Sequence, residues 1–199
     1  MKETVSNLKT EIVMSNDETK RYSLRKVWDE NKPSLAIVMI CPSSSGEVSV
    51  DTSTALTMAN CYRLGYGAVT IVNLFSKIND FAFKEAEEID EENLKAILKA
   101  AEENSCLVLA WGTGKAKNKA FQRRVEQVVT ALRFYEEKLY CLCDEKGGSR
   151  GLHPLSPRLR VWYLSPVKIR ELVELPSEKE SEQKKKPKVK NLTNEKNND

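Results

Sequence analysis

Ser34-Leu35-Ala36-Ile37-Val38-Met39-Ile40 is an uninterrupted apolar run of strand length. A strand that is apolar on both faces is typical of the interior of a parallel sheet covered by helices on both sides. Residues 68–74 and 106–111 are similar runs, and residues 138–142 form a further candidate strand. These segments predict the central strands of one sheet.

Helical patterns separate these strands. Residues 51–64 have apolar side chains at helical spacing, and Asp51 or Ser53 is available as an N-cap. Residues 91–103 predict a helix with an acidic face, and residues 115–135 predict a long basic helix. Because strands and helices alternate, we expect a three-layer α/β/α fold with a mainly parallel, four-stranded central sheet.

Both ends of the chain differ from this pattern. Residues 10–28 predict an N-terminal β-hairpin, because alternating segments flank the turn residues 15–18. Residues 176–199 are nearly all polar or charged, so we expect a disordered tail after a single domain over 1–175. The basic cluster from Lys184 to Lys190 could contact phosphates, direct nuclear import in a cell with a nucleus, or simply solubilise the chain.

Composition limits the class of protein. No apolar run approaches the roughly 18 residues that a membrane helix needs, and residues 1–4 begin no apolar signal region. We therefore expect a cytoplasmic protein without membrane contact. Five cysteines without a C-x-x-C pair indicate free thiols in a reducing compartment. Cys141 and Cys143 are expected to be strand residues rather than zinc ligands, and we expect no metal or other cofactor.

Polar residues follow the predicted strands, where ligands bind in sheets of this kind. Ser43 and Ser44 follow the first strand and Asn73 ends the second, although a local bond from Asn73 to the backbone is an alternative. His153, the only histidine of the chain, lies on a proline-rich loop after the fourth strand. It could meet a ligand as a titratable imidazole, or satisfy a carbonyl beside a rigid turn.

Gly112-Thr113-Gly114-Lys115 has the appearance of a phosphate-binding loop. Such a loop needs a glycine where this chain has Leu109 and a hydroxyl residue where it has Ala116, so we exclude ATP binding by that route. A glycine-rich turn before a helix can still bind a phosphate through its backbone amides. Gly112 and Lys115 therefore remain candidate phosphate-binding residues.

Four motifs follow one another along the chain: Cys41-Pro42-Ser43-Ser44-Ser45, Val72-Asn73-Leu74, Val108-Leu109-Ala110-Trp111-Gly112 and His153-Pro154-Leu155-Ser156-Pro157. This ordered set resembles the uracil-DNA glycosylase superfamily. That superfamily has a water-activating loop after its first strand, an Asn that ends its second strand, a Leu-Leu-Trp-Gly strand and a His-Pro-Ser-Pro loop. The resemblance implies a uracil-DNA glycosylase-like sheet.

A closer resemblance is to a domain-of-unknown-function family of bacteria and phages, number 1643. Three further motifs agree with its pattern: Asp51-Thr52-Ser53, Leu64-Gly65-Tyr66-Gly67 and Asn73-Leu74-Phe75. The strand that begins near Arg21 also fits the opening strand of that family. The resemblance covers about residues 22–157, which is nearly the whole predicted domain.

The glycosylase resemblance implies roles for individual residues. Asn73 would bind the Watson–Crick edge of a pyrimidine, with Ser43 and Ser44 close to the base. His153 would donate to the pyrimidine O2 as negative charge develops there. Phe75, Tyr66 or Trp111 would stack on the base, with packing in the core as the alternative for Trp111. Arg150 and Arg158 would pair with phosphates.

The chain departs from the glycosylase pattern at the water-activating loop. Residues 43–46 contain no carboxylate, and Glu47 and Asp51 are the nearest substitutes. Cys41 replaces the Asn that is usual in the unknown-function family, either as a nucleophile or as a small buried thiol.

Two hypotheses follow, and both take nucleic acid or a free nucleobase or nucleotide as the partner. The first is a glycosylase-like hydrolase, or another enzyme that acts on a pyrimidine or a modified pyrimidine. The second is a non-catalytic module that binds a nucleotide or nucleic acid in the same crevice. Fold alone does not separate them.

Overall fold

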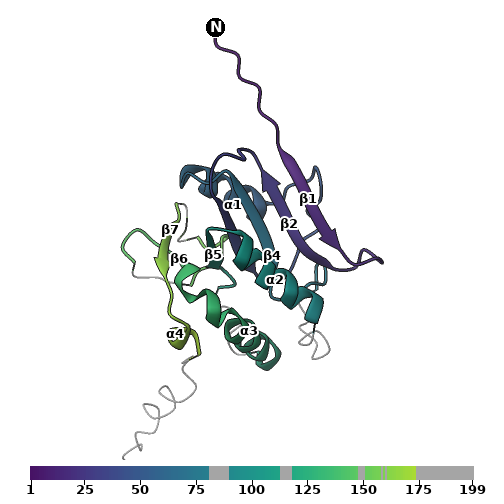
Figure 1. Cartoon of the computed structure of the whole chain (residues 1–199), viewed down its shortest axis with the longest axis vertical. Coiled ribbons are helices and arrows are strands. Elements are labelled where there is room, and N and C mark those ends of the chain that lie inside the picture. The colour runs from purple at the N-terminus through teal and green to yellow at the C-terminus, as the bar shows by residue number, and fades with distance from the viewer. Residues whose placement is uncertain (81–89, 113–117, 148–150, 158, 160, 174–199) are drawn as a thin grey trace, which may run out of the picture.

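The computed structural model describes residues 1–80, 90–112, 118–147, 151–157, 159, 161 to 173 of the chain. Its centre is a seven-stranded sheet with the order β1-β2-β4-β3-β5-β6-β7 (Figure 1). The strands are β1 Lys9–Met14, β2 Arg21–Val27, β3 Ser34–Met39, β4 Ala68–Asn73, β5 Cys106–Leu109, β6 Leu139–Cys143 and β7 Tyr163–Pro166. The helices are α1 Thr52–Arg63, α2 Glu91–Glu103, α3 Lys119–Ala131, the 3₁₀ helix η2 Leu132–Lys138, and α4 Ile169–Val173.

The sheet is mixed. Strands β4, β3, β5 and β6 are neighbours that pair in parallel, whereas β1 and β2 on one side and β7 on the other pair antiparallel. The expected α/β class is confirmed, but the sheet is mixed and not mainly parallel. The expected four-stranded sheet is too small, because the hairpin is not a separate attachment: β2 pairs with β4 and extends the sheet. Strand β7 extends the other edge.

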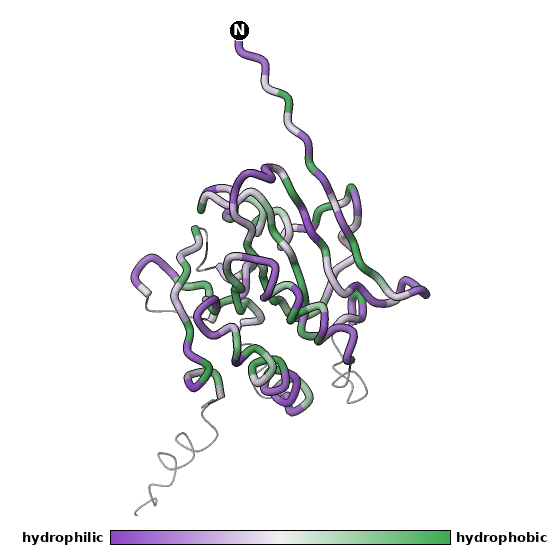
Figure 2. The backbone as a smooth tube through the Cα atoms, in the orientation of Figure 1, coloured by the Kyte–Doolittle hydropathy of each residue, from purple (hydrophilic) through white to green (hydrophobic). Residues whose placement is uncertain are grey.

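Both faces of the sheet are covered. Along β3, Ala36 and Val38 join a core with α2 and α3, while Leu35 and Ile37 join a second core with α1. Figure 1 shows α2 and α3 in front of the sheet and α1 behind it. In Figure 2 the central strands are mostly hydrophobic and the tips of the hairpin are hydrophilic. The uninterrupted apolar run in β3 therefore exists because each of its faces meets a different helical layer.

Some element bounds differ from the predictions. Helix α2 has the predicted bounds, whereas α3 begins only at Lys119, after its N-cap Asn118, and continues as the 3₁₀ helix η2. Strand β7 was not predicted, because a four-residue segment that ends in proline has little strand signal; an edge position tolerates the missing donor. The predicted tail after residue 175 lies outside the described residues. No helix in the described part of the chain is long and apolar enough to cross a membrane.

Candidate active site

A small pocket opens where β3 ends and α1 begins. Its volume is about 260 Å³, near the lower end of the range for small-molecule sites. The pocket is lined by Arg21, Met39, Ile40, Cys41, Ser43, Asp51, Ser53, Thr54, His153 and Leu155. It therefore brings together the loop after the first predicted strand, the start of the following helix and the proline-rich loop.

Two buried cations of β2 hold the loop between β3 and α1. The Arg21 guanidinium donates through Nη1 to the carbonyl of Ser45 at 2.8 Å and to that of Ser43 at 3.4 Å. The Lys26 ammonium donates to the carbonyls of Glu47 at 2.8 Å and Gly46 at 3.3 Å. A loop without ladder partners must satisfy its carbonyls in another way, and these side chains do so.

Asp51 combines a structural role with a place in the pocket. Its Oδ1 accepts the backbone N–H of Thr54 at 2.6 Å and so caps α1, while Oδ2 accepts the hydroxyl of Ser43. Burial acts to raise the pKa of the Asp51 carboxyl, but the hydrogen bonds from Ser43 and Thr54 outweigh burial, and this pKa lies below its ordinary value. Asp51 is therefore an ionised carboxylate at neutral pH.

His153 is a neutral donor. Its Nδ1 accepts the backbone N–H of Leu155 at 3.2 Å. Burial lowers the pKa of the imidazole below its ordinary value, and the charge of Asp51 opposes this shift only in part. Because Nδ1 is an acceptor, the neutral ring carries its proton on Nε2, which is free to donate.

Gly112 supports the His153 loop from the end of β5. Its φ is +71°, and a Cβ at this position would lie 3.2 Å from the Cβ of His153. A side chain there would be strained by the backbone and crowded by the histidine. The described contact of Gly112 is thus with His153; its predicted role in phosphate binding stays a prediction. Lys115, Arg150 and Arg158, also predicted to bind phosphate, lie outside the described residues.

Asn73 lies beside the pocket but does not line it. It ends β4 in register with Met39, which does line the pocket, and both side chains point toward the α1 face. Asn73 is 1% exposed, and its Nδ2 is buried without a hydrogen-bond partner. Among the described residues, the Asn73 amide nitrogen therefore does not form the hydrogen bond to the local backbone that was the alternative to ligand binding.

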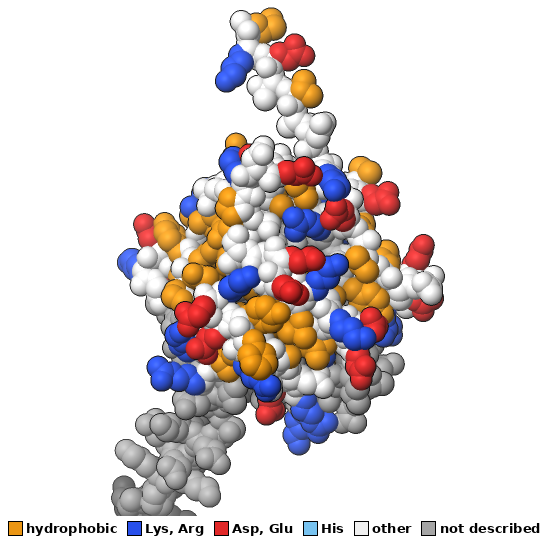
Figure 3. Space-filling model, in the orientation of Figure 1, with side chains coloured by type: hydrophobic (Ala, Val, Ile, Leu, Met, Phe, Trp, Pro, Cys, Tyr) orange, Lys and Arg blue, Asp and Glu red, His pale blue; other side chains and the backbone are white. Residues whose placement is uncertain are grey.

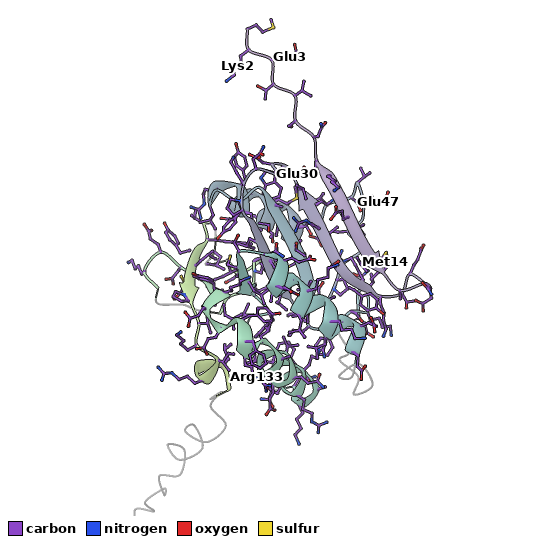
Figure 4. All side chains as sticks on the ribbon, in the orientation of Figure 1. Lys2, Glu3, Met14, Glu30, Glu47 and Arg133 are labelled. Carbon is purple, nitrogen blue, oxygen red and sulfur yellow. The ribbon has the colours of Figure 1, made fainter. Side chains whose placement is uncertain are left out.

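Two predicted residues near the pocket point away from it. Glu47 is exposed and does not line the pocket; Figure 4 shows it at the outer side of the hairpin, toward β1. Its backbone carbonyl accepts from Lys26 and Thr10; burial lowers the pKa of Lys26, and the charge of Glu47 acts to raise it. Ser44 is exposed and does not line the pocket either. Of the two nearest carboxylates, only Asp51 therefore lines the pocket.

The aromatic residues proposed for stacking lie elsewhere. Phe75 is 1% exposed and packs against Phe121 of α3, with ring centroids 6.4 Å apart. No face of its ring is open to a ligand, which corrects the stacking role. The Tyr66 hydroxyl lies 3.3 Å from the Cys106 thiol, at the opposite ends of the strands from the pocket. Trp111 packs against the core shared with α2 and α3, as its alternative role predicted.

Arg21 was missed as a pocket residue, and no local signal could have found it. An arginine that opens a hairpin strand is expected to be exposed, and its burial here depends on carbonyls more than twenty residues later in the chain. Cys41, considered as a nucleophile or a buried thiol, is half-buried in the pocket wall, and its thiol donates to the carbonyl of Asp80 at 3.0 Å.

A larger groove of about 840 Å³ lies along α3 and η2 and includes Leu98, Phe134 and Tyr135. Figure 3 shows hydrophobic side chains gathered on the lower centre of the face that α2 and α3 cover. The charged side chains along the groove come from surface positions of the helices, including Arg123 and Glu126. In the groove, Gln127 accepts from the buried Arg124 at 2.8 Å.

The molecule is therefore a mixed α/β protein with a small pocket, lined by both apolar and polar side chains, beside the carboxyl ends of its parallel strands. Residues 21–155 match the family described as "Protein of unknown function (DUF1643)", and the chain belongs to this family. The match begins at Arg21 and ends at Leu155, both of which line the pocket. No curated protein and no solved structure matches the chain.

Proposed function

We propose that this pocket binds a pyrimidine base and hydrolyses the bond between the base and its sugar, as in uracil-DNA glycosylases. One observation carries the proposal: an ionised carboxylate, Asp51, and a neutral imidazole donor, His153, line the same small pocket. Hydrolysis of an N-glycosidic bond develops negative charge on the base and positive charge on the sugar. The pocket offers one group suited to each.

Each group has a defined task in this mechanism. The C1′–N1 bond breaks with its electron pair going to the base, and the Nε2–H of His153 donates to the pyrimidine O2 as it becomes anionic. The Asp51 carboxylate stabilises the cationic sugar and orients a water molecule, whose oxygen adds to C1′ while its proton passes to solvent. Each Asp51 oxygen already accepts one hydrogen bond but retains a further lone pair for that water.

Base selection falls to Asn73 in this proposal. Its buried amide nitrogen lacks a partner, which is a cost that a ligand acceptor would remove. Met39 neighbours Asn73 on the adjacent strand and lines the pocket. Since methionine is flexible, its displacement by a base would open a path to the amide.

A second candidate function is binding without catalysis. The observation that favours it is the low pKa of Asp51, which makes the carboxylate a weak general base. In that case the same pocket holds the nucleobase and no product forms.

Purified protein incubated with uridine, with uridine 5′-monophosphate and with single- and double-stranded oligonucleotides that contain uracil tests both functions. We expect release of free uracil from the substrate that the pocket accepts, detected by chromatography, and its loss in Asp51→Asn. Glu47→Gln is the matched control, because Glu47 is a nearby carboxylate that points away from the pocket. Uridine binding without uracil release would establish the binding module. Absence of both binding and release would overturn the proposal.

A further inference from the structure

The Arg21 guanidinium has one edge anchored and one edge free. Nη1 is held by the carbonyls of Ser43 and Ser45. Nε is buried without a hydrogen-bond partner, and among the described residues nothing accepts from Nη2 either. Nε and Nη2 lie on the same edge of the guanidinium, and this edge forms paired hydrogen bonds with two oxygens of a carboxylate or phosphate.

The free edge belongs to a side chain that is 2% exposed and lines the pocket. Burial lowers the pKa of Arg21, and the charge of Asp51 opposes that shift. Arginine nevertheless stays protonated in proteins, so the pocket wall contains a buried cation. No described carboxylate forms an ion pair with it, and both oxygens of Asp51 are directed to Ser43 and Thr54. A buried donor of this kind is costly unless an acceptor meets it.

The N-terminus of α1 faces the same pocket. Ser53 and Thr54, in the first turn of this twelve-residue helix, line the cavity together with Arg21. Backbone N–H groups in the first turn have no partners within the helix, and the helix dipole favours negative charge there. The Thr54 N–H is used by Asp51, whereas those of Thr52 and Ser53 precede it in the same turn.

We infer that this pocket binds a phosphate group between the free edge of Arg21 and the first turn of α1, so that its ligand is a phosphorylated nucleoside and not a bare base. The nucleoside part rests on the function proposed above; the phosphate part rests on Arg21 and α1 alone. The small pocket can take no more than one nucleotide, either a free nucleoside monophosphate or the end of a strand, and the experiment below distinguishes these two sources of the phosphate.

Isothermal titration calorimetry with the full chain tests this inference. The probes are inorganic phosphate, uridine, uridine 5′-monophosphate and a 5′-phosphorylated uridine trinucleotide. We expect phosphate to bind saturably and the monophosphate to bind about tenfold more tightly than uridine, as one added charge-assisted contact implies. The trinucleotide should bind no more tightly than the monophosphate; tighter binding would assign the phosphate site to a nucleic-acid end.

Arg21→Lys keeps the charge and removes the paired edge, so it should reduce the advantage of the monophosphate over uridine to less than about threefold. Arg124→Lys is the matched control. Arg124 is equally buried and also donates to a backbone carbonyl, that of Leu74, but it belongs to α3 and does not line the pocket. This control should leave the advantage unchanged.

Nitrogen-15 NMR of arginine Nε–H signals in the wild-type protein keeps the test valid if Arg21→Lys does not fold. Phosphate should shift the signal of Arg21. Equal affinity of uridine and its monophosphate, or phosphate titration that leaves the Arg21 signal in place, would overturn the inference. If phosphate shifts Arg21 but uridine does not bind, the anion site stands and the proposed pyrimidine function falls. If uridine binds and the phosphate adds no affinity, the proposed pyrimidine function stands and the anion site falls.

Discussion

Asp51→Asn separates the structural role of this residue from its proposed chemistry. The substitution keeps an oxygen to accept the Thr54 N–H, and Asn is as good an N-cap as Asp. The amide nitrogen takes the place of Oδ2, so the Ser43 hydroxyl accepts from it instead of donating. The variant loses mainly the interaction of a negative charge with the helix dipole, about 0.3–1 kcal/mol. For a domain of this length that corresponds to a fall in Tm of about 1–4 °C. Turnover should fall on the order of 100-fold, as for other lost electrostatic groups.

Asp51→Ala should lower the stability of the protein more than Asp51→Asn does, and it should lower turnover by a similar factor. It removes the cap, which costs about 0.5–2 kcal/mol, and leaves the Ser43 hydroxyl without its acceptor. Calorimetry gives the stability of both variants, and uracil release gives their turnover.

Asp90→Asn is the matched control for these variants. Asp90 caps α2 through the Asn93 N–H at 3.0 Å and also accepts a serine hydroxyl, from Ser76 at 2.7 Å, yet it does not line the pocket. Asp90 also pairs with Lys20 at 2.8 Å, and the substitution weakens this contact. The Asp90→Asn variant should be less stable than the wild-type protein and should keep the wild-type turnover. If Asp51→Asn retains wild-type turnover while Asp51→Ala loses both properties, Asp51 is only a helix cap and the proposed mechanism is wrong.

Three further predictions concern His153 and its support. His153→Ala should lower turnover on the order of 100-fold with little change in uridine affinity, and His153→Gln, which retains a donor, should keep more activity; equal loss of affinity and turnover in single-turnover kinetics would contradict this. Burial depresses the pKa of His153, the chain's only histidine, so the unfolded state binds a proton before the folded state does as the pH falls below about 6.5. The stability of the protein should therefore drop below this pH, and it should drop less in His153→Gln. Thermal melts between pH 5.5 and 7.5 that are identical for the two proteins would refute this prediction. Gly112→Ala should cost about 1–2 kcal/mol in backbone strain and weaken uridine binding by displacing His153, measured by melting and calorimetry; unchanged binding would show that the contact is unimportant.

The sequence predicted the elements whose signals are local. The apolar run of β3, the periodicity of α2 and the cap at Asp51 each depend on neighbouring residues, and each is found in the structure. Placing Ser43, Asp51 and His153 at strand ends also sufficed to bring them into one pocket, because the parallel strands carry their following loops to the same edge of the sheet.

The rest depends on contacts between distant parts of the chain. Phe75 was expected to stack on a base because it follows a strand end, but α3 covers this position and its ring enters the core. Glu47 is close to Asp51 in sequence, yet its backbone is held by Lys26 and its carboxylate faces outward. Arg21 is buried only because a later loop supplies carbonyls to it. None of these partners can be inferred from spacing along the chain.

A crystal structure of the protein with uridine 5′-monophosphate would show whether this pocket binds a phosphorylated pyrimidine. We expect the nucleotide in the pocket between β3 and α1, with its phosphate against Arg21 and a pyrimidine oxygen within hydrogen-bond distance of His153 Nε2. Nucleotide density in the groove along α3 and η2, or an empty pocket at a saturating concentration, would contradict it.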